Sequence, residues 1–313
     1  MRNAFTDELT KLGDTNPQVV MLSGDIGNRL FDKFKDKHPR RFYNCGVAEQ
    51  NMMGVAAGMA MSGLRPVVYT ITPFVTTRCL EQIRNDVCYH QAPVTIVAVG
   101  AGMSYAGLGP THHSCEDIAL LRSLPNMVVI CPGDAWEVRA ALRAVMAQDR
   151  PAYIRLGKKG EAVLHSGSLD SFAIGKALPI TDGSDVCLLS TGNMLPEAVE
   201  AGRLLETRGL SVRVVSFHSV KPLDEDCLWE SFGRFKLVAT IEEHSLIAGF
   251  GSAVAEWVAD NGVKPNNFLR FGTPDAFFKL SGEQEFAREQ LDLSGHKIAE
   301  RIFQSFDVKQ GAA

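Results

Sequence analysis

Short apolar runs alternate with amphipathic segments along most of the chain, and this alternation limits the possible folds more than any other feature. Runs that are apolar throughout are typical of strands buried on both faces of a parallel sheet, with the intervening helices covering those faces. The strand-like runs of the first half are 18–23, 65–71, 93–99, 127–130 and 152–155, and those of the second half are 186–190, 212–217 and 237–241. We therefore predict an α/β protein with two doubly wound domains.

A polar stretch with little helical pattern separates the two alternating halves. The chain has 313 residues, a length that usually corresponds to two domains. We place the first domain at 1–160, a linker at 161–175 and a second, smaller domain at 176–313.

Composition excludes several classes of protein. The formal charge of −4 gives no general attraction to nucleic acid or to an anionic membrane, so small molecules and proteins are the expected partners. The chain has no apolar run of the roughly 18 residues that a membrane span needs, and its start is amphipathic, unlike a signal peptide. We expect a cytoplasmic protein.

The seven cysteines are scattered along the chain without a CxxC pair, as is typical of reduced thiols, and no metal site is predicted.

The stretch 44–63, NCGVAEQNMMGVAAGMAMSG, is the strongest candidate for a functional helix. After Glu49 it is small or apolar nearly all round, which predicts a buried helix whose Gly and Ala positions allow close approach at a domain or subunit interface. A carboxylate in such a dry place either pairs with a cation or becomes protonated, whereas a first-turn Glu can also simply complement the helix dipole.

Two further segments lie where ligands bind in open α/β sheets, at the carboxyl ends of strands. Asp25 directly follows the run 18–23, where it is either a ligand contact or a turn former. The loop 100–114 is long and rich in glycine, as functional loops often are. It lacks a complete dinucleotide-binding fingerprint, which disfavours a nicotinamide dehydrogenase.

Three motifs in sequence order, GDI at 24–26, GVAEQ at 46–50 and GPTHHS at 109–114, make the chain resemble one enzyme family. Together with the second-half runs 219–226 and 242–256, they resemble the pyrimidine-binding and carboxyl-terminal domains of transketolases and deoxyxylulose-phosphate synthases. The resemblance covers nearly the whole chain and implies thiamine diphosphate as cofactor.

The resemblance implies a cofactor site. Glu49 matches the family glutamate that hydrogen-bonds the aminopyrimidine ring and thereby activates the cofactor, and Phe74 matches the aromatic residue that packs on that ring. Asp25 matches an aspartate near the cofactor at the subunit interface. Ordinary transketolases carry further aromatic residues where this chain has Thr77 and Leu80.

The resemblance also implies substrate contacts. His112 matches the histidine that faces the sugar, as a hydrogen-bond donor or proton shuttle. Lys158 matches the position of an arginine for the substrate phosphate, and Arg155 could assist it. Leu108 and Gly100 replace an acidic residue and a histidine of ordinary transketolases, which disfavours a standard pentose-phosphate donor.

The family holds the diphosphate and Mg²⁺ on a separate amino-terminal domain with a GDG motif, which this sequence lacks. We therefore expect the carboxyl-terminal subunit of a split transketolase-like enzyme, a transferase of carbohydrate metabolism. It would be active only with an amino-terminal subunit, in a heterotetramer built on a dimer of the present chain, and would act on small sugar substrates.

Three alternatives remain open. A deoxyxylulose-phosphate synthase is possible, since the run EQIRNDV at 81–87 looks like that branch. The β subunit of a 2-oxoacid dehydrogenase has the same two domains but normally lacks the run at 109–112. A non-catalytic subunit is disfavoured by the presence of Glu49, Phe74 and His112.

Overall fold

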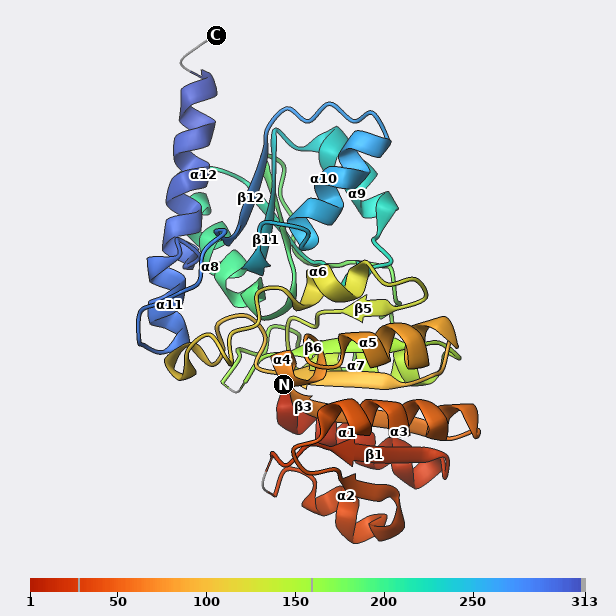
Figure 1. Cartoon of the computed structure of the whole chain (residues 1–313). Coiled ribbons are helices and arrows are strands. Elements are labelled where there is room, and N and C mark those ends of the chain that lie inside the picture. The colour runs from red at the N-terminus through yellow and green to blue at the C-terminus, as the bar shows by residue number, and fades with distance from the viewer. Residues whose placement is uncertain (28, 159, 311–313) are drawn as a thin grey trace.

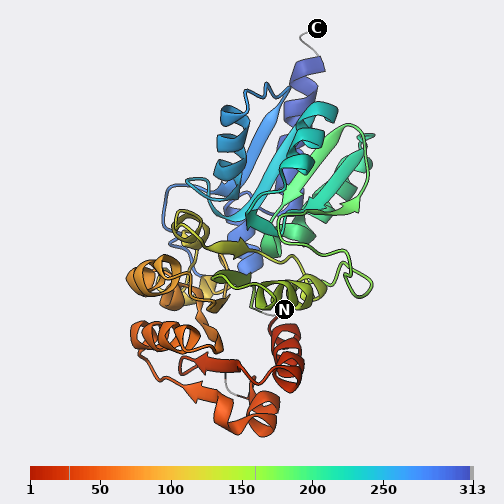
Figure 2. The same ribbon diagram turned by 90° about the vertical axis from the view of Figure 1, so that its right-hand side faces the viewer.

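The computed structural model describes residues 1–27, 29–158 and 160–310 of the chain. It contains two β-sheets, one in each half of the molecule, and each sheet lies between layers of helices (Figure 1). In both ribbon views the N-terminus lies within the first half, at the start of α1, and the C-terminus lies at the far end of the second half (Figure 2).

The first sheet has seven strands in the order β10-β5-β6-β4-β3-β1-β2. The strands are β1 (Val19–Ser23), β2 (Phe42–Asn44), β3 (Arg65–Ile71), β4 (Thr95–Val99), β5 (Val128–Ile130), β6 (Ala152–Leu156) and β10 (Ser219–Lys221). All neighbours pair in parallel except β10, which comes from the second half of the chain and runs antiparallel to β5.

Helices cover both faces of this sheet, as its fully buried strands require. One face packs against α1 (Arg2–Thr15), α2 (Asp32–Lys37) and α7 (Ala135–Met146). The other face packs against α3 (Glu49–Met61), the π-helical segment η2 (Ile83–Tyr89) and α6 (Asp117–Arg122). Shorter segments are η1 (Pro39–Arg41), α4 (Thr72–Val75), α5 (Leu80–Gln82) and η3 (Ala106–Leu108).

The second sheet has five strands in the order β12-β11-β8-β9-β7. The strands are β7 (Leu178–Thr181), β8 (Val186–Ser190), β9 (Val212–Ser216), β11 (Leu237–Ser245) and β12 (Phe268–Thr273). The helices are η4 (Gly192–Met194), α8 (Leu195–Glu206), α9 (Glu225–Arg234), α10 (Phe250–Asp260), α11 (Gln284–Gln290) and α12 (Gly295–Gln310). Helices α8 and α12 cover one face, and α9 and α10 cover the other (Figure 1).

The predicted fold class, two doubly wound α/β units, is confirmed. Each strand-like run named above becomes a strand, whereas β2, β7, β10, β12 and α11 were not predicted. The segment from Thr72 to Tyr89 is not one continuous helix, because it is broken between α4 and α5. The break begins at Thr76, a β-branched residue whose hydroxyl donates to the carbonyl of Thr72 at 2.7 Å.

Helix α3 is buried on one side within this chain. Met52, Met53, Ala56, Ala57 and Ala60 are buried against the sheet, but the opposite side is open to solvent in the isolated chain. On that side Val55 is 40% exposed and Met61 is 57% exposed. The helix is apolar nearly all round, but only one side packs within the chain.

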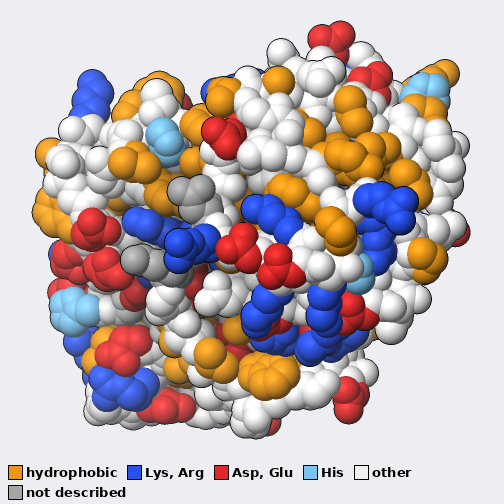
Figure 3. Space-filling model, turned by 90° about the horizontal axis from the view of Figure 1, so that it is seen from below, with side chains coloured by type: hydrophobic (Ala, Val, Ile, Leu, Met, Phe, Trp, Pro, Cys, Tyr) orange, Lys and Arg blue, Asp and Glu red, His pale blue; other side chains and the backbone are white. Residues whose placement is uncertain are grey.

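The surface carries charges of both signs. On the face shown in Figure 3, acidic and basic side chains are interspersed, without a broad patch of one sign.

Among the residues that the structure describes, none of the helices has the length and apolar character needed to cross a membrane.

Candidate active site

The predicted site residues follow different strands of the first sheet but lie at the same end of it. Asp25 comes after β1, Phe74 after β3, His112 in the loop after β4, and Lys158 after β6, while Glu49 starts α3 after β2. These strands are parallel, so their carboxyl ends meet at one side of the sheet, which is where open α/β sheets bind ligands.

Glu49 is buried at the start of α3, with 5% of its surface exposed. Its partner is Arg78, whose Nη1 lies 2.8 Å from Glu49 Oε2. The cation expected as one alternative for a carboxylate in this place is therefore present. Arg78 reaches it from the irregular stretch between α4 and α5.

The ring of Phe74 joins Glu49 to the rest of the site. Arg78 Cζ lies 4.3 Å from the centroid of the Phe74 ring, in a cation–π contact. On another side, Phe74 meets the ring of His112 edge to face, with centroids 5.2 Å apart. Glu49, Arg78, Phe74 and His112 thus form a continuous series of contacts.

His112 is a half-buried imidazole in the glycine-rich loop. Its Nδ1 lies 2.9 Å from the hydroxyl oxygen of Thr111, and its ring meets Tyr105 with centroids 6.1 Å apart. Burial, with the neighbouring His113, lowers the pKa of His112 below 6.5. The imidazole is therefore neutral at pH 7 and can both donate and accept hydrogen bonds.

Tyr105 connects His112 to Lys158 and explains the glycine at position 100. Lys158 Nζ lies 5.1 Å from the centroid of the Tyr105 ring. Gly100 has a φ of +92°, and a Cβ at this position would lie 2.3 Å from Tyr105 Cδ2. The tyrosine ring therefore takes the space that a histidine at position 100 would need.

Asp25 is exposed and lies in the turn after β1, where it contacts the turn that precedes α3. Its Oδ1 accepts a hydrogen bond from Asn44 Nδ2 at 3.0 Å, and its backbone N–H donates to the carbonyl of Gly46 at 3.0 Å. Asn44 Oδ1 in turn accepts from the N–H of Gly46. This position agrees with the turn-forming alternative, and within the described residues the hydrogen bond to the Asp25 carboxylate reaches Oδ1.

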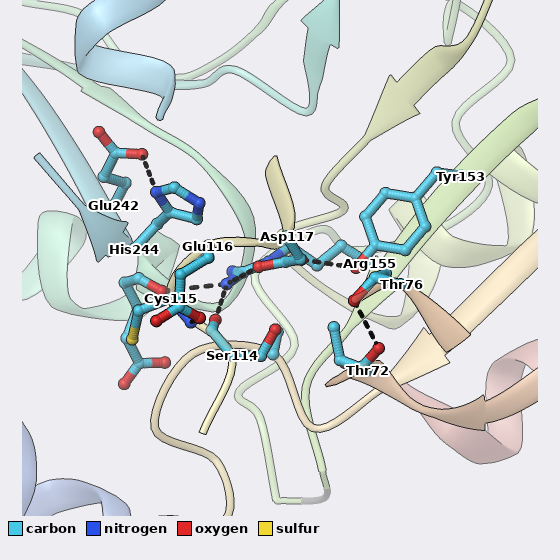
Figure 4. A network of polar contacts seen from close by, with 12 residues as sticks. Thr72, Thr76, Ser114, Cys115, Glu116, Asp117, Tyr153, Arg155, Glu242 and His244 are labelled. Atoms are coloured by element: carbon cyan, nitrogen blue, oxygen red, sulfur yellow. Dashed lines mark hydrogen bonds and ion pairs between the residues drawn. The ribbon is translucent and has the colours of Figure 1, made fainter. Parts of the chain in front are cut away.

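Arg155 lies elsewhere than the substrate-binding role requires. It is 1% exposed, and it pairs with Asp117 through Nε at 2.7 Å and Nη2 at 3.1 Å (Figure 4). Burial alone would lower the pKa of Arg155, but Asp117 raises it, so the guanidinium stays charged. The structure does not support the predicted assistance of Arg155 to Lys158, because its charge is used within the core.

Asp117 lies three residues after Ser114, which is the spacing of a capping box, but the two residues do not form one. Helix α6 begins at Asp117 without a side-chain cap, and the carboxylate instead accepts hydrogen bonds from Arg155 and from Tyr153 Oη at 2.5 Å. Arg155 Nη2 also donates to the carbonyls of Ser114 and Glu243. This network joins the glycine-rich loop to the second half of the chain.

Glu243 and His244, near the carboxyl end of β11, lie where the two halves of the chain meet. Glu243 accepts hydrogen bonds from Asn193 at 2.6 Å and from Arg288 Nε at 3.0 Å. His244 Nε2 accepts from the N–H of Ala119 at 3.3 Å. The His244 contact joins the second half of the chain to the first, whereas Asn193 and Arg288 belong to the second half, as Glu243 itself does.

Sequence reasoning missed three residues that organise this region. Arg78 follows Phe74 by four residues, a spacing that could have indicated a contact. Tyr105 gave no signal of its own, and Asp117 gave only the spacing of a helix cap, because the partners of its carboxylate, Tyr153 and Arg155, lie elsewhere in the chain. Within residues 1–27, 29–158 and 160–310, no three His, Cys, Asp or Glu side chains are grouped as a metal site would require.

Comparisons with known proteins identify the family of the chain. Residues 1–160 match the family model "Transketolase, pyrimidine binding domain", and residues 175–291 match "Transketolase, C-terminal domain". The chain therefore belongs to the transketolase family.

The relatives include chains of similar length. A putative transketolase C-terminal section of Methanocaldococcus jannaschii is 37% identical over 97% of this chain and 95% of its own length. One of the subunits of the apulose-4-phosphate transketolase of Phocaeicola vulgatus is 33% identical over 94% of each chain. A 1-deoxy-D-xylulose-5-phosphate synthase of Geobacter sulfurreducens is 36% identical over 95% of this chain, which spans only 48% of that enzyme.

A solved structure is also similar. It is described as a split-gene transketolase, inactive beta4 tetramer, and it matches with a TM-score of 0.87 and 36% identity over 97% of this chain and 96% of its own.

Proposed function

We propose that this chain is the carboxyl-terminal subunit of a thiamine diphosphate-dependent, split transketolase-like enzyme that transfers a two-carbon ketol unit between sugars or sugar phosphates. The observation that carries the proposal is the buried carboxylate of Glu49 beside the face of Phe74, at the ligand-binding end of the sheet. Similar length to the apulose-4-phosphate transketolase subunit and to the transketolase C-terminal section supports the split arrangement.

The chemistry of the site suits the aminopyrimidine ring of the cofactor. Glu49 and Phe74 already hold the guanidinium of Arg78, which is a flat cation with N–H donors. A flat nitrogen heterocycle that stacks on the Phe74 ring and hydrogen-bonds the Glu49 carboxylate would occupy the place that this guanidinium takes. Bound there, the cofactor supplies the nucleophilic carbon that accepts and releases the ketol unit.

Each residue of the site has a distinct task in this proposal. Glu49 holds a proton at a ring nitrogen, and Phe74 orients the ring. The neutral imidazole of His112 donates a hydrogen bond to a sugar oxygen on which charge develops. Lys158 attracts a substrate phosphate, and Asp25 contacts the cofactor from the turn after β1.

The proposed assembly combines this chain with an amino-terminal subunit that carries the diphosphate and Mg²⁺ ligands. Two copies of the present chain would pair through the open side of α3, where Val55 and Met61 are exposed beside Gly54 and Gly58. Small residues allow two backbones to approach closely, and a second copy would bury this apolar surface.

The test mixes the purified chain with candidate amino-terminal subunits. Calorimetry would measure binding of thiamine diphosphate with Mg²⁺, and ketol transfer would be assayed with a panel of ketose phosphates. We expect tight binding and turnover only in a mixture. Tight binding to the isolated chain would contradict the divided cofactor site.

Two variants test the catalytic assignments. E49Q should lower kcat at least about 100-fold, as loss of an acid–base group does. The matched control is E81Q, because Glu81 is an exposed glutamate on nearby α5. Equal turnover of E49Q and E81Q would refute the role of Glu49.

A second candidate function is that of a deoxyxylulose-phosphate synthase, favoured by 36% identity to such an enzyme. Adding pyruvate to the substrate panel separates the two functions, because the synthase reaction releases carbon dioxide and ketol transfer does not. Carbon dioxide release with an aldehyde acceptor would replace the transketolase proposal.

A further inference from the structure

The guanidinium of Arg78 contacts Glu49 and Phe74, the two residues assigned above to the cofactor ring. Its Nη1 is 2.8 Å from the carboxylate of Glu49, and its Cζ is 4.3 Å from the centroid of Phe74. We propose that Arg78 is a displaceable placeholder: it occupies the ring site until its side chain turns outward and releases Glu49 and Phe74. This inference rests on the proposed function, which assigns those two residues to the aminopyrimidine.

A guanidinium is well suited to hold such a site. It is planar, stacks on aromatic faces and donates N–H bonds to carboxylates, so it satisfies a buried carboxylate and an aromatic ring at the same time. Without a cation, Glu49 would be a buried charge, which is costly. Arg78 therefore keeps the two groups in place and covered before a ligand arrives.

The contact is built so that the side chain can leave while the backbone stays. The side chain of Arg78 is 42% exposed, whereas that of Glu49 is 5% exposed, so outward rotation carries the guanidinium directly into water. Its backbone is fixed by two hydrogen bonds: its N–H donates to the carbonyl of Pro73 at 3.1 Å, and its carbonyl accepts from Gln50 Nε2 at 3.0 Å.

Competition follows from this geometry. A ring that binds Glu49 and Phe74 must first break the ion pair and the cation–π contact, both of which are modest at a half-exposed position. Removing the guanidinium should therefore strengthen binding of the ring by roughly tenfold, an estimate based on those two contacts together.

The experiment uses the full chain and the free pyrimidine alcohol 4-amino-5-hydroxymethyl-2-methylpyrimidine as probe. This probe lacks the diphosphate, so the measurement needs neither Mg²⁺ nor the other subunit. Its dissociation constant would be measured by ligand-observed NMR for wild type, R78Q and R84Q. Arg84 is an exposed arginine that bonds to the side chain of Asn85 at 2.7 Å, which makes R84Q the matched control.

We expect R78Q to bind the probe roughly tenfold more tightly than wild type, and R84Q to bind it as wild type does. If R78Q binds the probe no better than wild type, or binds it more weakly, the placeholder is refuted. The double variant E49Q/R78Q separates the two proposals. Equal binding by R78Q and the double variant would remove Glu49 from the proposed function and leave Arg78 as a cover for Phe74 alone.

Discussion

The buried pair of Asp117 and Arg155 makes a strong prediction about stability. Asp117 accepts three hydrogen bonds, from Arg155 Nε at 2.7 Å, Arg155 Nη2 at 3.1 Å and Tyr153 Oη at 2.5 Å. The side chains of Asp117 and Arg155 are 1% and 0% exposed. The variant D117N keeps the shape but leaves the charge of Arg155 buried without its counter-charge.

The cost can be estimated from this geometry. Breaking one side of a buried ion pair costs about 3–5 kcal/mol, a large part of a typical total stability of about 5–15 kcal/mol. Burial alone would raise the pKa of Asp117, but Arg155 outweighs burial and lowers it below 3.8. The carboxylate therefore stabilises the fold above pH 3.8, and this contribution is lost as the pH falls through the lowered pKa.

The assay is urea unfolding at pH 7, followed by circular dichroism. D117N should lower the midpoint by about 1 M, given the denaturant dependence expected for a chain of this size. The matched control is D149N, which removes the partner of Arg65 at a surface position where Asp149 is 89% exposed. That change should cost less than about 1 kcal/mol.

The same experiment can refute the reasoning. A D117N midpoint equal to that of D149N would mean that Arg155 does not depend on the counter-charge. The double variant D117L/R155M removes both charges and should recover much of the loss, as replacement of a buried pair by apolar residues often does. If the two substitutions lower the free energy of unfolding additively, the two residues act independently.

Three further predictions concern separate parts of the molecule. Burial alone would raise the pKa of Asp134, but hydrogen bonds from the His165 ring and from backbone N–H groups lower it to about 2, so the carboxylate stabilises the fold above pH 3.8 and this contribution is lost toward pH 2. Urea titrations of D134N should therefore show a flatter pH dependence of the unfolding free energy over that range; an unchanged dependence would contradict the assignment. Gly100→Ala should cost at least about 1 kcal/mol, since the φ of +92° and the Tyr105 ring both oppose a Cβ, and a wild-type melting temperature would exclude this strain. G58R, at a position where a Cβ meets nothing within 4 Å, should fold normally but lower the mass of the assembly in light scattering, and an unchanged mass would argue against pairing through α3.

Local sequence patterns predicted the elements that carry their own signal. The run 65–71 became β3 at the predicted bounds, because its apolar and β-branched residues form a buried strand whatever their neighbours are. Glu49 was predicted to be buried and is, since the small and apolar residues after it fix the inner side of α3. The domain boundaries at 160 and 175 and the roles of the site residues remain predictions.

Features that depend on distant partners could not be predicted. Asp117 has the spacing of a helix cap, but the guanidinium of Arg155, 38 residues away, decides where its carboxylate lies. The open side of α3 has the composition of a buried surface but is exposed in this chain. Its exposure could not be predicted, because composition does not distinguish burial within a chain from burial between chains. Strand β10 is three residues long, which is too short to show a strand-like sequence pattern. It is recognised as a strand through its pairing with β5.

Strand β10 has a consequence for any attempt to divide this protein. It belongs to the second half of the chain in sequence but completes the first sheet in space, beside β5. A fragment ending near residue 160 would expose the unpaired N–H and C=O groups of β5, and exposed edge strands of this kind promote aggregation. The complementary fragment would carry an unpaired β10. We therefore expect the two halves to fold as one unit, although each has its own sheet and its own layers of helices.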